Sequence, residues 1–299
     1  MKIPIVFLGT GQAIPTMKRN HTSIWMEYKH ETFLIDCGEG TQRQIRKAGL
    51  NPCKITKIFI THWHGDHILG IPGLLQTLAL NGYNRKLEIY GPRGTKEHFS
   101  RIMGMFVFEG KIDYDVKEIS SGKFLENEDY SFEALPMKHG IPCIAYSFIE
   151  KDKLRIDKSK MKKLGLEASP LMKDIKAGKD IVWKGKKVKA KDLVYEESGK
   201  KISFILDTVL NDNCYKISEN ADLLICESTY LDSDAEKAEE YLHMTAEKAA
   251  GIAKKSKVKK LILIHLSQRY EYKEKLVLAE AKKIFKEVIV GEDLMKIEI

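Results

Sequence analysis

Residues 61–67 read T-H-W-H-G-D-H and gather several groups that can bind a metal ion. The candidate ligands in this stretch are His62, His64, Asp66 and His67. Side chains two positions apart in an extended segment leave the same face, so His62 and His64 point the same way. Gly65 allows the chain to turn before the apolar pattern at 68–80, which predicts a helix. The stretch is therefore expected to be a strand-to-helix loop that presents three imidazoles and one carboxylate.

These ligand types indicate which metal binds and how many ions are held. Three imidazoles and a carboxylate are costly to bury without a cation. Nitrogen and oxygen donors without sulfur suit zinc, with manganese or iron as alternatives. Four protein ligands could close one structural site, but Asp207, His265 and His139 bring the number of candidates to seven. Seven ligands suit two ions, and a two-metal site is the usual device for phosphoester hydrolysis.

The elements that must position these residues alternate between strands and helices. Apolar, β-branched or aromatic runs predict strands at 3–8, 23–28, 32–36, 57–60, 87–90, 143–149, 202–206, 222–226 and 261–264. Helical patterns occur at 41–48, 68–80, 95–103, 245–255 and 273–286. Several of these strands are apolar throughout, so both of their faces must be covered. The predicted fold class is therefore α/β.

Four of the predicted strands end in a polar residue that could react or bind. The run K-I-F-I precedes residues 61–67. The runs S-F-I-L, L-L-I-C and L-I-L-I precede Asp207, Glu227 and His265. In open α/β sheets, ligands bind at the carboxyl ends of the strands. We therefore expect these side chains to converge at one sheet edge.

The positive charge of the chain is concentrated in one segment. Residues 151–201 hold 17 Lys and Arg against eight Asp and Glu, a net charge of +9. Because the whole chain carries +8, the other 248 residues together carry about −1. Such a segment suggests a polyanionic partner, since Lys and Arg gain affinity for nucleic acid by releasing condensed counterions. The alternative is a solvated lysine-rich surface, as in heat-adapted proteins. The segment is expected to be an insertion in a single domain, 1–299.

The bulk composition narrows the class of protein. No apolar run reaches the ~18 residues that a membrane span needs. The apolar stretch at the N-terminus is short and interrupted by glycines, so it does not predict a secretory signal. The five cysteines are scattered and form no C-x-x-C. Free thiols predict a reducing compartment, so we expect a cytoplasmic protein.

Longer motifs resemble the ribonuclease Z family, the tRNA 3′-processing endonucleases of the metallo-β-lactamase superfamily. The pattern H-x-H-x-D-H at 62–67 alone is typical of the superfamily. The motifs that resemble the nucleases are F-L-G-T-G-x-A-x-P-T-x-K-R-N-x-T-S (7–23), L-I-D-C-G-E-G-T-Q (34–42), T-H-W-H-G-D-H-I-L-G-I-P-G-L-L (61–75), M-K-H (137–139), D-T (207–208), E-S-T-Y (227–230), H-M-T-A-x-x-A-A-x-I-A (243–253) and L-I-L-I-H-L-S-Q-R-Y (261–270). They extend over nearly the whole chain.

The resemblance implies a fold and a set of ligands. The fold is a four-layer αββα sandwich with the metal ions at one edge. One zinc ion would be held by His62, His64 and His139, and a second by Asp66, His67 and His265. Asp207 would bridge the two ions, and Asp66 would also act as general base. Two zinc ions would make hydroxide available near neutral pH, and hydrolysis would leave a 3′-hydroxyl on the tRNA and a 5′-phosphate on the trailer.

Further roles follow from position in these motifs. His243 could protonate the leaving 3′-oxygen or bind the scissile phosphate, and otherwise would be a surface histidine that caps a helix. Glu227 could orient His243 or be purely structural. Asp36 is expected to fix a histidine ligand. The basic side chains near the site are Lys18, Arg19 and Arg269, which could contact phosphates or simply carry surface charge.

Three functions are weighed. The first is the zinc endonuclease, whose partners would be precursor tRNA and a second copy of the chain, with neither DNA nor a membrane. In it, residues 151–201 would be an arm that grips the tRNA far from the cut. The second is another hydrolase of the same fold, a small-molecule phosphodiesterase or arylsulfatase, which would need no basic arm. The third is a non-catalytic RNA-binding protein with a structural metal, in which a complete set of seven ligands is not expected.

Overall fold

A computed structural model of the chain describes residues 2–107, 112–167 and 169–299. The chain divides into two compact units. The larger, here the main unit, consists of Met1–Leu125, Phe132–Phe148 and Lys201–Ile299. The smaller, here the small unit, consists of Glu126–Ser131 and Ile149–Lys200. Ala168, which belongs to the predicted basic segment, lies outside the described residues.

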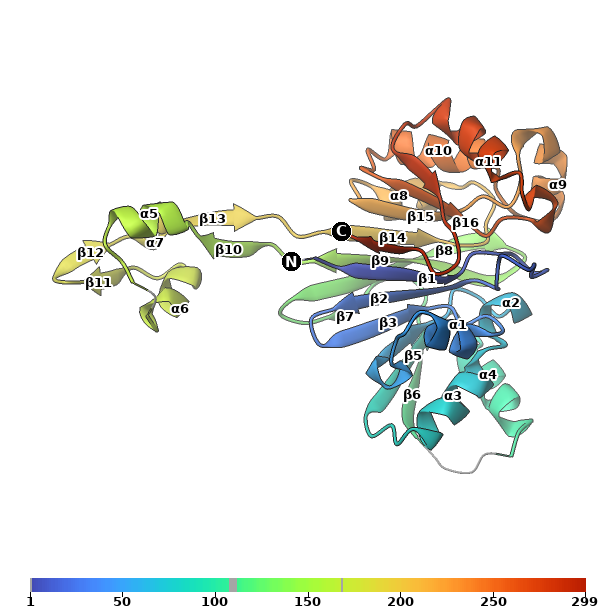
Figure 1. Cartoon of the computed structure of the whole chain (residues 1–299), viewed down its shortest axis with the longest axis horizontal. Coiled ribbons are helices and arrows are strands. Elements are labelled where there is room, and N and C mark those ends of the chain that lie inside the picture. Colours follow the sequence, from blue (N-terminus) through green and yellow to red (C-terminus); the bar gives the residue numbers. More distant parts are fainter. Residues whose placement is uncertain (1, 108–111, 168) are drawn as a thin grey trace. The chain divides into compact units, whose positions relative to one another are not determined.

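Two seven-stranded sheets form the frame of the main unit (Figure 1). The first has the strand order β18-β1-β2-β3-β4-β5-β6, with β18 at Lys296–Glu298, β1 at Pro4–Gly9, β2 at Ser23–Tyr28, β3 at Glu31–Ile35, β4 at Lys57–Phe59, β5 at Lys86–Gly91 and β6 at Asp113–Glu118. The second has the order β17-β16-β15-β14-β9-β8-β7, with β17 at Val288–Val290, β16 at Leu261–Ile264, β15 at Leu223–Glu227, β14 at Lys201–Ile205, β9 at Ile141–Glu150, β8 at Tyr130–His139 and β7 at Gly122–Glu126.

Helices cover the outer face of each sheet (Figure 1). On the first sheet these are α1 (Thr41–Lys47), α2 (Gly65–Ile68), α3 (Ile71–Leu80) and α4 (Thr95–Gly104), with the 3-10 helix η1 at Pro52–Lys54. On the second they are α8 (Asp212–Ser218), α9 (Ala235–Glu240), α10 (Ala246–Lys255) and α11 (Glu274–Lys282), with η2 at Asp232–Asp234 and η3 at Gln268–Tyr270. Separate apolar clusters join the helices to each sheet. Both faces of the central strands are therefore buried, as their apolar sequences predict.

Aromatic side chains fill the space between the two sheets. The ring of Phe132 in β8 stacks on Phe59 of β4 at 4.4 Å between centroids. It also meets Phe33 of β3 edge-on at 5.2 Å. Such offset and edge-to-face pairs add to the free energy gained from burying the rings. The second sheet is thereby fixed against the strands that precede the histidine loop.

Parallel pairing brings the ends of the key strands together. In the first sheet β3 pairs with β4 in parallel, with Ile35 opposite Phe59. In the second, β14, β15 and β16 are parallel neighbours, with Ile205 opposite Cys226. Parallel neighbours end on the same edge of a sheet, so the residues that follow them are close in space. The prediction of an α/β fold is confirmed, with the two sheets described above.

Each of the nine predicted strands corresponds to an observed strand, and two of the predicted helices differ from the observed ones. The helix predicted over 273–286 is α11, which begins at Glu274 and ends at Lys282. The helix predicted over 68–80 is two helices, α2 and α3, separated by Leu69 and Gly70. A Cβ atom on Gly70 would lie 2.1 Å from the Gly38 carbonyl oxygen. The break therefore lets the chain pass close to the turn after β3.

The small unit has a core of its own. Its strands are β10 (Lys153–Ile156) paired antiparallel with β13 (Val194–Glu197), and β11 (Ile181–Trp183) paired antiparallel with β12 (Lys186–Val188). Its helices are α5 (Lys158–Lys163), α6 (Leu171–Lys176) and α7 (Ala190–Leu193). Five buried residues form its apolar cluster, namely Leu166, Ile175, Ile181, Ala190 and Leu193. That the chain is a single domain with residues 151–201 as an insertion remains a prediction.

Two general features bear on the expected environment. Among the described residues, no helix is both long and apolar enough to cross a membrane. The five cysteines are all free thiols, and four of them are buried.

Candidate metal centre

Several candidate residues lie in tight turns directly after parallel strands. Asp36 follows β3, Asp207 follows β14 and His265 follows β16, and all three have positive φ angles of 56°, 41° and 59°. This left-handed conformation is uncommon for residues with a Cβ atom and concentrates at functional sites. Gly38 allows close backbone packing in the same region, because a Cβ atom there would lie 2.3 Å from the Asp66 carbonyl oxygen. The backbone thus places three polar side chains at the ends of strands from both sheets.

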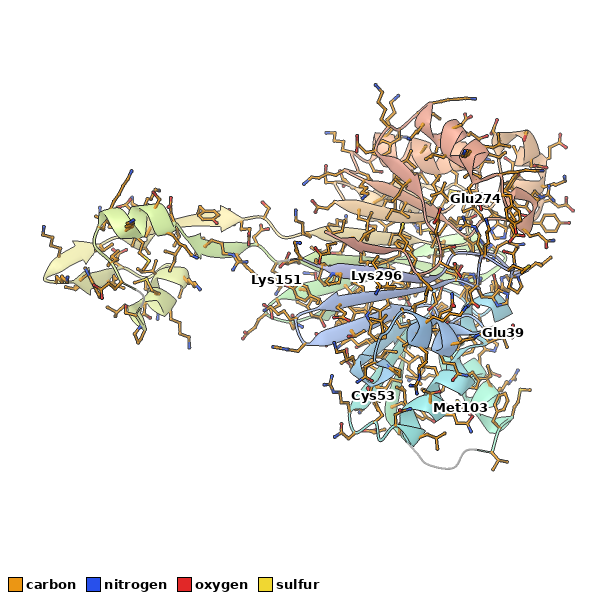
Figure 2. The ribbon with its side chains drawn as sticks, viewed as in Figure 1. Glu39, Cys53, Met103, Lys151, Glu274 and Lys296 are labelled. Carbon is orange, nitrogen blue, oxygen red and sulfur yellow. The ribbon has the colours of Figure 1, made fainter. Side chains whose placement is uncertain are left out.

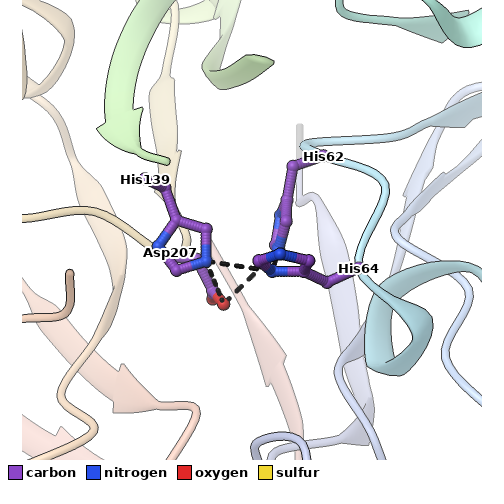
Figure 3. Close-up of side chains that lie close together, drawn as sticks. All are labelled: His62, His64, His139 and Asp207. Atoms are coloured by element: carbon purple, nitrogen blue, oxygen red, sulfur yellow. Dashed lines mark hydrogen bonds and ion pairs between the residues drawn. The ribbon is translucent and has the colours of Figure 1, made fainter. Parts of the chain in front are cut away.

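Four side chains form a first donor set, shown in Figure 3: His62, His64, His139 and Asp207. His64 Nδ1 lies 3.1 Å from both His62 Nε2 and His139 Nε2. Asp207 Oδ2 lies 3.5 Å from each of the same two Nε2 atoms. His139 comes from the end of β8, so both sheets contribute to this set.

A second donor set shares the Asp207 carboxylate through its other oxygen. It consists of Asp66, His67, His265 and Asp207. His67 Nε2 lies 3.3 Å from His265 Nε2, 3.3 Å from Asp66 Oδ2 and 3.4 Å from Asp207 Oδ1. His265 Nε2 lies 3.4 Å from Asp66 Oδ2 and 3.1 Å from Asp207 Oδ1. All four members of this second set are buried.

These spacings fit two metal ions. Zinc–nitrogen and zinc–oxygen bonds of about 2.0–2.1 Å in a tetrahedron place the donor atoms about 3.3–3.4 Å apart. The measured separations of 3.1–3.5 Å lie around that value in both sets. Asp207 Oδ1 is fully buried yet accepts no hydrogen bond. A buried carboxylate oxygen without a donor needs a cation. The chemistry and spacing of the donors are therefore consistent with a dinuclear metal site.

The charges of the two donor sets also favour cations. Burial opposes the ionisation of Asp207, but His265 and His67 outweigh it and hold the pKa of Asp207 well below its usual range. Burial also opposes a charge on His67, but the carboxylates of Asp207 and Asp66 outweigh it and raise the pKa of His67 well above its ordinary value. The surrounding carboxylates therefore favour positive charge at this position, which suits a bound metal ion.

Asp36 touches the site without being a donor in either set. Its Oδ2 atom lies 2.6 Å from His67 Nδ1, and its Oδ1 accepts the backbone N–H of Thr61 at 2.8 Å. Burial raises the pKa of Asp36, and the contacts to His67 and Thr61 act against that rise. With His67 Nδ1 held by this carboxylate, His67 Nε2 is directed into the second donor set.

Glu227 and His243 lie beside the donors. His243 Nδ1 is 3.1 Å from Glu227 Oε1, and the His243 ring centroid is 4.9 Å from that of His139. Glu227 is completely buried and also accepts the backbone N–H groups of Thr208 and Met244. Burial opposes the charge on each side chain, but each one stabilises the charge of the other. The pKa of Glu227 is lowered, and that of His243 is raised to about 9. The pair therefore presents a charged imidazole next to the donor sets.

The three basic side chains singled out from the sequence have different surroundings. Lys18 is exposed, with its Nζ 4.0 Å from the centroid of the Tyr272 ring. Arg269 is paired with Asp234 at 2.9 Å, and its guanidinium lies over the Tyr230 ring.

Arg19 differs from these two because it is 4% exposed. Its Nη1 donates to Thr10 Oγ1 and to the Gly291 carbonyl, both at 2.7 Å. Its Nη2 lies 3.5 Å from Oε1 of Glu274, a residue that is labelled in Figure 2. These contacts hold the loop after β1 against the residue that follows β17 and against the start of α11, and the expectation that Arg19 contacts phosphate stays a prediction.

The sequence reading missed two hydroxyl groups at the centre. Thr61 precedes His62 and hydrogen-bonds to Asp36, and Thr229 lies 3.0 Å from His265 Nδ1. The signal in the sequence was weak. Each threonine stands in a motif beside charged residues, which are more obvious candidates for ligands or catalytic groups.

Comparisons with known proteins cover the whole chain. A family model described as anti-Pycsar protein Apyc1 matches residues 3–156. The ribonuclease Z of Methanothermobacter thermautotrophicus is 40% identical over 296 residues, covering 99% of this chain and 96% of the relative. The ribonuclease Z of Pyrococcus abyssi is 41% identical over 274 residues, covering 91% and 89%.

Two solved structures share the fold over nearly the full length. The crystal structure of the short form of human tRNase Z is 31% identical, with a TM-score of 0.72 and 98% of both chains covered. The metallo-beta-lactamase fold protein YhfI from Bacillus subtilis is 19% identical, with a TM-score of 0.72 and coverage of 100% and 99%. The second likeness concerns the fold alone, and it identifies the two-sheet arrangement as the metallo-β-lactamase fold.

Proposed function

Because the chain belongs to the ribonuclease Z family and is thus a hydrolase, we propose that it removes the 3′ trailer of tRNA precursors. The cut would fall after the discriminator base, leaving a 3′-hydroxyl on the tRNA and a 5′-phosphate on the trailer. The observation that carries this proposal is the pair of donor sets that share the Asp207 carboxylate, each with its donor atoms within 4.8 Å of one another. Two adjacent metal ions suit phosphodiester hydrolysis, in which both the attacking and the leaving oxygen need stabilisation.

We assign zinc to both donor sets, with manganese or iron as substitutes. His62, His64 and His139 would hold one ion, Asp66, His67 and His265 the other, and Asp207 would contact both. Bound zinc lowers the pKa of water to near neutrality and offsets negative charge on the phosphate. The nitrogen- and oxygen-only donor sets support zinc over iron–sulfur chemistry, which needs cysteine sulfur.

The chain's own residues would move the protons. Asp66 takes a proton from the attacking water as general base, and the water oxygen forms the new bond to phosphorus. The bond between phosphorus and the 3′-oxygen breaks, and that oxygen takes a proton from His243. A protonated His243 next to Glu227 suits the second step, since the contact to Glu227 stabilises the imidazolium. Glu227 thereby acts as a positioning residue.

We assign the grip on the tRNA body to the small unit. A cavity of about 780 Å³ within this unit is lined by Arg155, Lys158, Lys162 and Lys176 around an apolar floor. Clustered cations bind phosphates without reading sequence, which suits an enzyme that must accept many tRNAs. Lys18 and Arg269 would contact phosphates nearer the cut. We further propose that the protein acts as a homodimer in the cytoplasm.

The test is single-turnover cleavage of a 3′-extended tRNA precursor, with both new ends mapped, for wild type and for Asp66→Ala refolded with zinc. We expect wild type to cut after the discriminator base and Asp66→Ala to lose several orders of magnitude in rate. The second candidate is a small-molecule phosphodiesterase of the same fold. An intact precursor, with rapid hydrolysis of bis(p-nitrophenyl) phosphate, would favour that candidate and overturn the tRNA assignment.

A further inference from the structure

Two threonine hydroxyls each lie between a buried carboxylate and a histidine of the donor sets. Thr61 Oγ1 donates to Asp36 Oδ2 at 2.7 Å and lies 3.1 Å from His62 Nδ1. Thr229 Oγ1 donates to Glu227 Oε2 at 2.7 Å and lies 3.0 Å from His265 Nδ1. Both threonines are at most 1% exposed. The same carboxylate–hydroxyl–imidazole chain thus occurs twice.

The direction of these hydrogen bonds follows from counting protons. A hydroxyl has one proton to donate, and a carboxylate can only accept. Asp36 receives three donors, namely the backbone N–H and hydroxyl of Thr61 and His67 Nδ1. The proton of Thr61 is therefore used by the carboxylate, and its oxygen must accept from His62 Nδ1–H. The same count applies to Thr229, because Glu227 accepts its hydroxyl proton and the Thr229 oxygen is then free to accept from His265 Nδ1–H at 3.0 Å. His243 Nδ1 lies farther from that oxygen, at 3.3 Å, and its proton goes to Glu227 Oε1 at 3.1 Å.

This direction fixes which ring nitrogen carries the proton. With the proton on Nδ1, the lone pair of Nε2 in His62 and in His265 faces the donor sets. His139 is fixed in another way, because its Nδ1 lies 2.9 Å from the Leu242 carbonyl. Only the tautomer with a free Nε2 can bind a metal ion through that atom. The two threonines serve different sets, since His62 belongs to the first and His265 to the second.

We propose that Thr61 and Thr229 are positioning residues. Each hydroxyl connects a buried carboxylate to one histidine of one donor set through hydrogen bonds, and so orients that histidine. Thr61 prepares His62 for the first ion, and Thr229 prepares His265 for the second. Glu227 contacts both Thr229 and His243, so it would link the second ion to the proposed proton donor. This inference rests on the proposed two-metal site and is independent of which RNA is cut.

The competing explanation is that the threonines only fill space. Valine has nearly the shape of threonine without the hydroxyl, and serine keeps the hydroxyl without the methyl group. The variants are therefore Thr61→Val, Thr61→Ser, Thr229→Val and Thr229→Ser. Thr22→Val is the matched control, because Thr22 is equally buried but its hydroxyl donates to a backbone carbonyl, that of Gly11, instead of to a carboxylate.

The first measurement is zinc affinity and stoichiometry of the full chain, stripped of metal and titrated with zinc against a chromophoric chelator. We expect each valine variant to bind one of its two ions about 10–100-fold more weakly, as is typical when a partner of a ligand is lost. The serine variants should bind within about threefold of wild type, and Thr22→Val should bind like wild type. Wild-type affinity in both valine variants, or equal losses in valine and serine variants, would overturn the proposal.

A second measurement needs no variant that might fail to fold. Long-range proton–nitrogen correlation spectra of the zinc-free wild type, at mildly alkaline pH, report which ring nitrogen of each histidine is protonated. We expect His62 and His265 to carry the proton on Nδ1, and Nε2 protonation would overturn the proposal. If zinc binds as expected but wild type leaves precursor tRNA intact, the proposed function fails and this inference stands.

Discussion

The two donor sets and the small unit place their charged groups in opposite ways. In the donor sets the groups are mostly buried, their separations vary by only a few tenths of an ångström, and neighbouring hydrogen bonds hold several of them. In the small unit the lysines are largely exposed and surround a core of five buried residues. The contrast fits the two proposed roles, because bond cleavage needs fixed geometry, whereas binding of a polyanion needs only enough charge within reach.

The largest effect is expected from the carboxylate that both donor sets share. Asp207→Ala removes one donor from each set. Each metal ion contributes several kcal/mol of transition-state stabilisation. We therefore expect precursor cleavage to fall by at least about 10⁴-fold, together with the loss of bound zinc, measured by single-turnover kinetics and metal analysis.

The matched control for this prediction is Asp212→Ala. Asp212 is an exposed carboxylate at the start of α8, five positions further along the chain. It should retain both zinc and cleavage. If the Asp207→Ala protein kept two zinc ions, Asp207 would not be a ligand shared by the two donor sets. The contrast between fixed donor sets and the exposed lysines of the small unit would then lose its main support.

A smaller effect is expected from His243→Gln. This change removes the proposed proton donor and leaves every member of the two donor sets in place. General acid catalysis contributes about 10²–10⁴-fold, so cleavage should fall by that factor with zinc content unchanged. A substrate whose leaving oxygen needs no proton, such as bis(p-nitrophenyl) phosphate, should lose far less. Equal losses on both substrates would assign His243 to the metal site instead of proton transfer.

The small unit should show the opposite pattern. Replacing Lys158, Lys162 and Lys176 by Gln removes three cations from its cavity. Because each phosphate contact releases condensed counterions, precursor affinity should fall by about 10–100-fold and depend less steeply on salt. The measurements are KM and its salt dependence, with bis(p-nitrophenyl) phosphate hydrolysis as the control. If hydrolysis of the small substrate were also lost, substrate binding and bond cleavage would not be divided between the small unit and the donor sets.

The fold was predictable where a strand is apolar throughout and harder to predict elsewhere. Strands such as β15 and β16 are fully buried and have a continuous apolar sequence. β8 escaped prediction because buried and exposed positions mix along Tyr130–His139, and Pro136 interrupts the run. In the small unit the strands have three or four residues, and β10, β12 and β13 include charged side chains. Their pairing is decided by contacts that sequence periodicity does not reveal.

The donor sets could be predicted because their members are histidines and aspartates, and several of these follow apolar strands in the sequence. Asp207 and His265 were found from the single polar residue that follows an apolar run. Thr61 and Thr229 could not be found in this way, since a threonine beside a charged residue is common and only the three-dimensional contacts show its partners.

The smallest effect concerns the stability of the small unit. The side chain of Asp157 accepts the backbone N–H groups of Ser159 and Lys160 and so caps α5. Asp157→Ala removes this cap at a cost of about 1 kcal/mol, which corresponds to about fivefold faster amide exchange in residues 157–166. Asp157→Asn keeps an accepting oxygen and is the control. Exchange in β14 to β16 and hydrolysis of the small substrate should be unchanged, because the donor sets draw their rigidity from the main unit. Faster exchange around His62 and His265 would mean that the two regions share their stability, and the comparison drawn here would have to be abandoned.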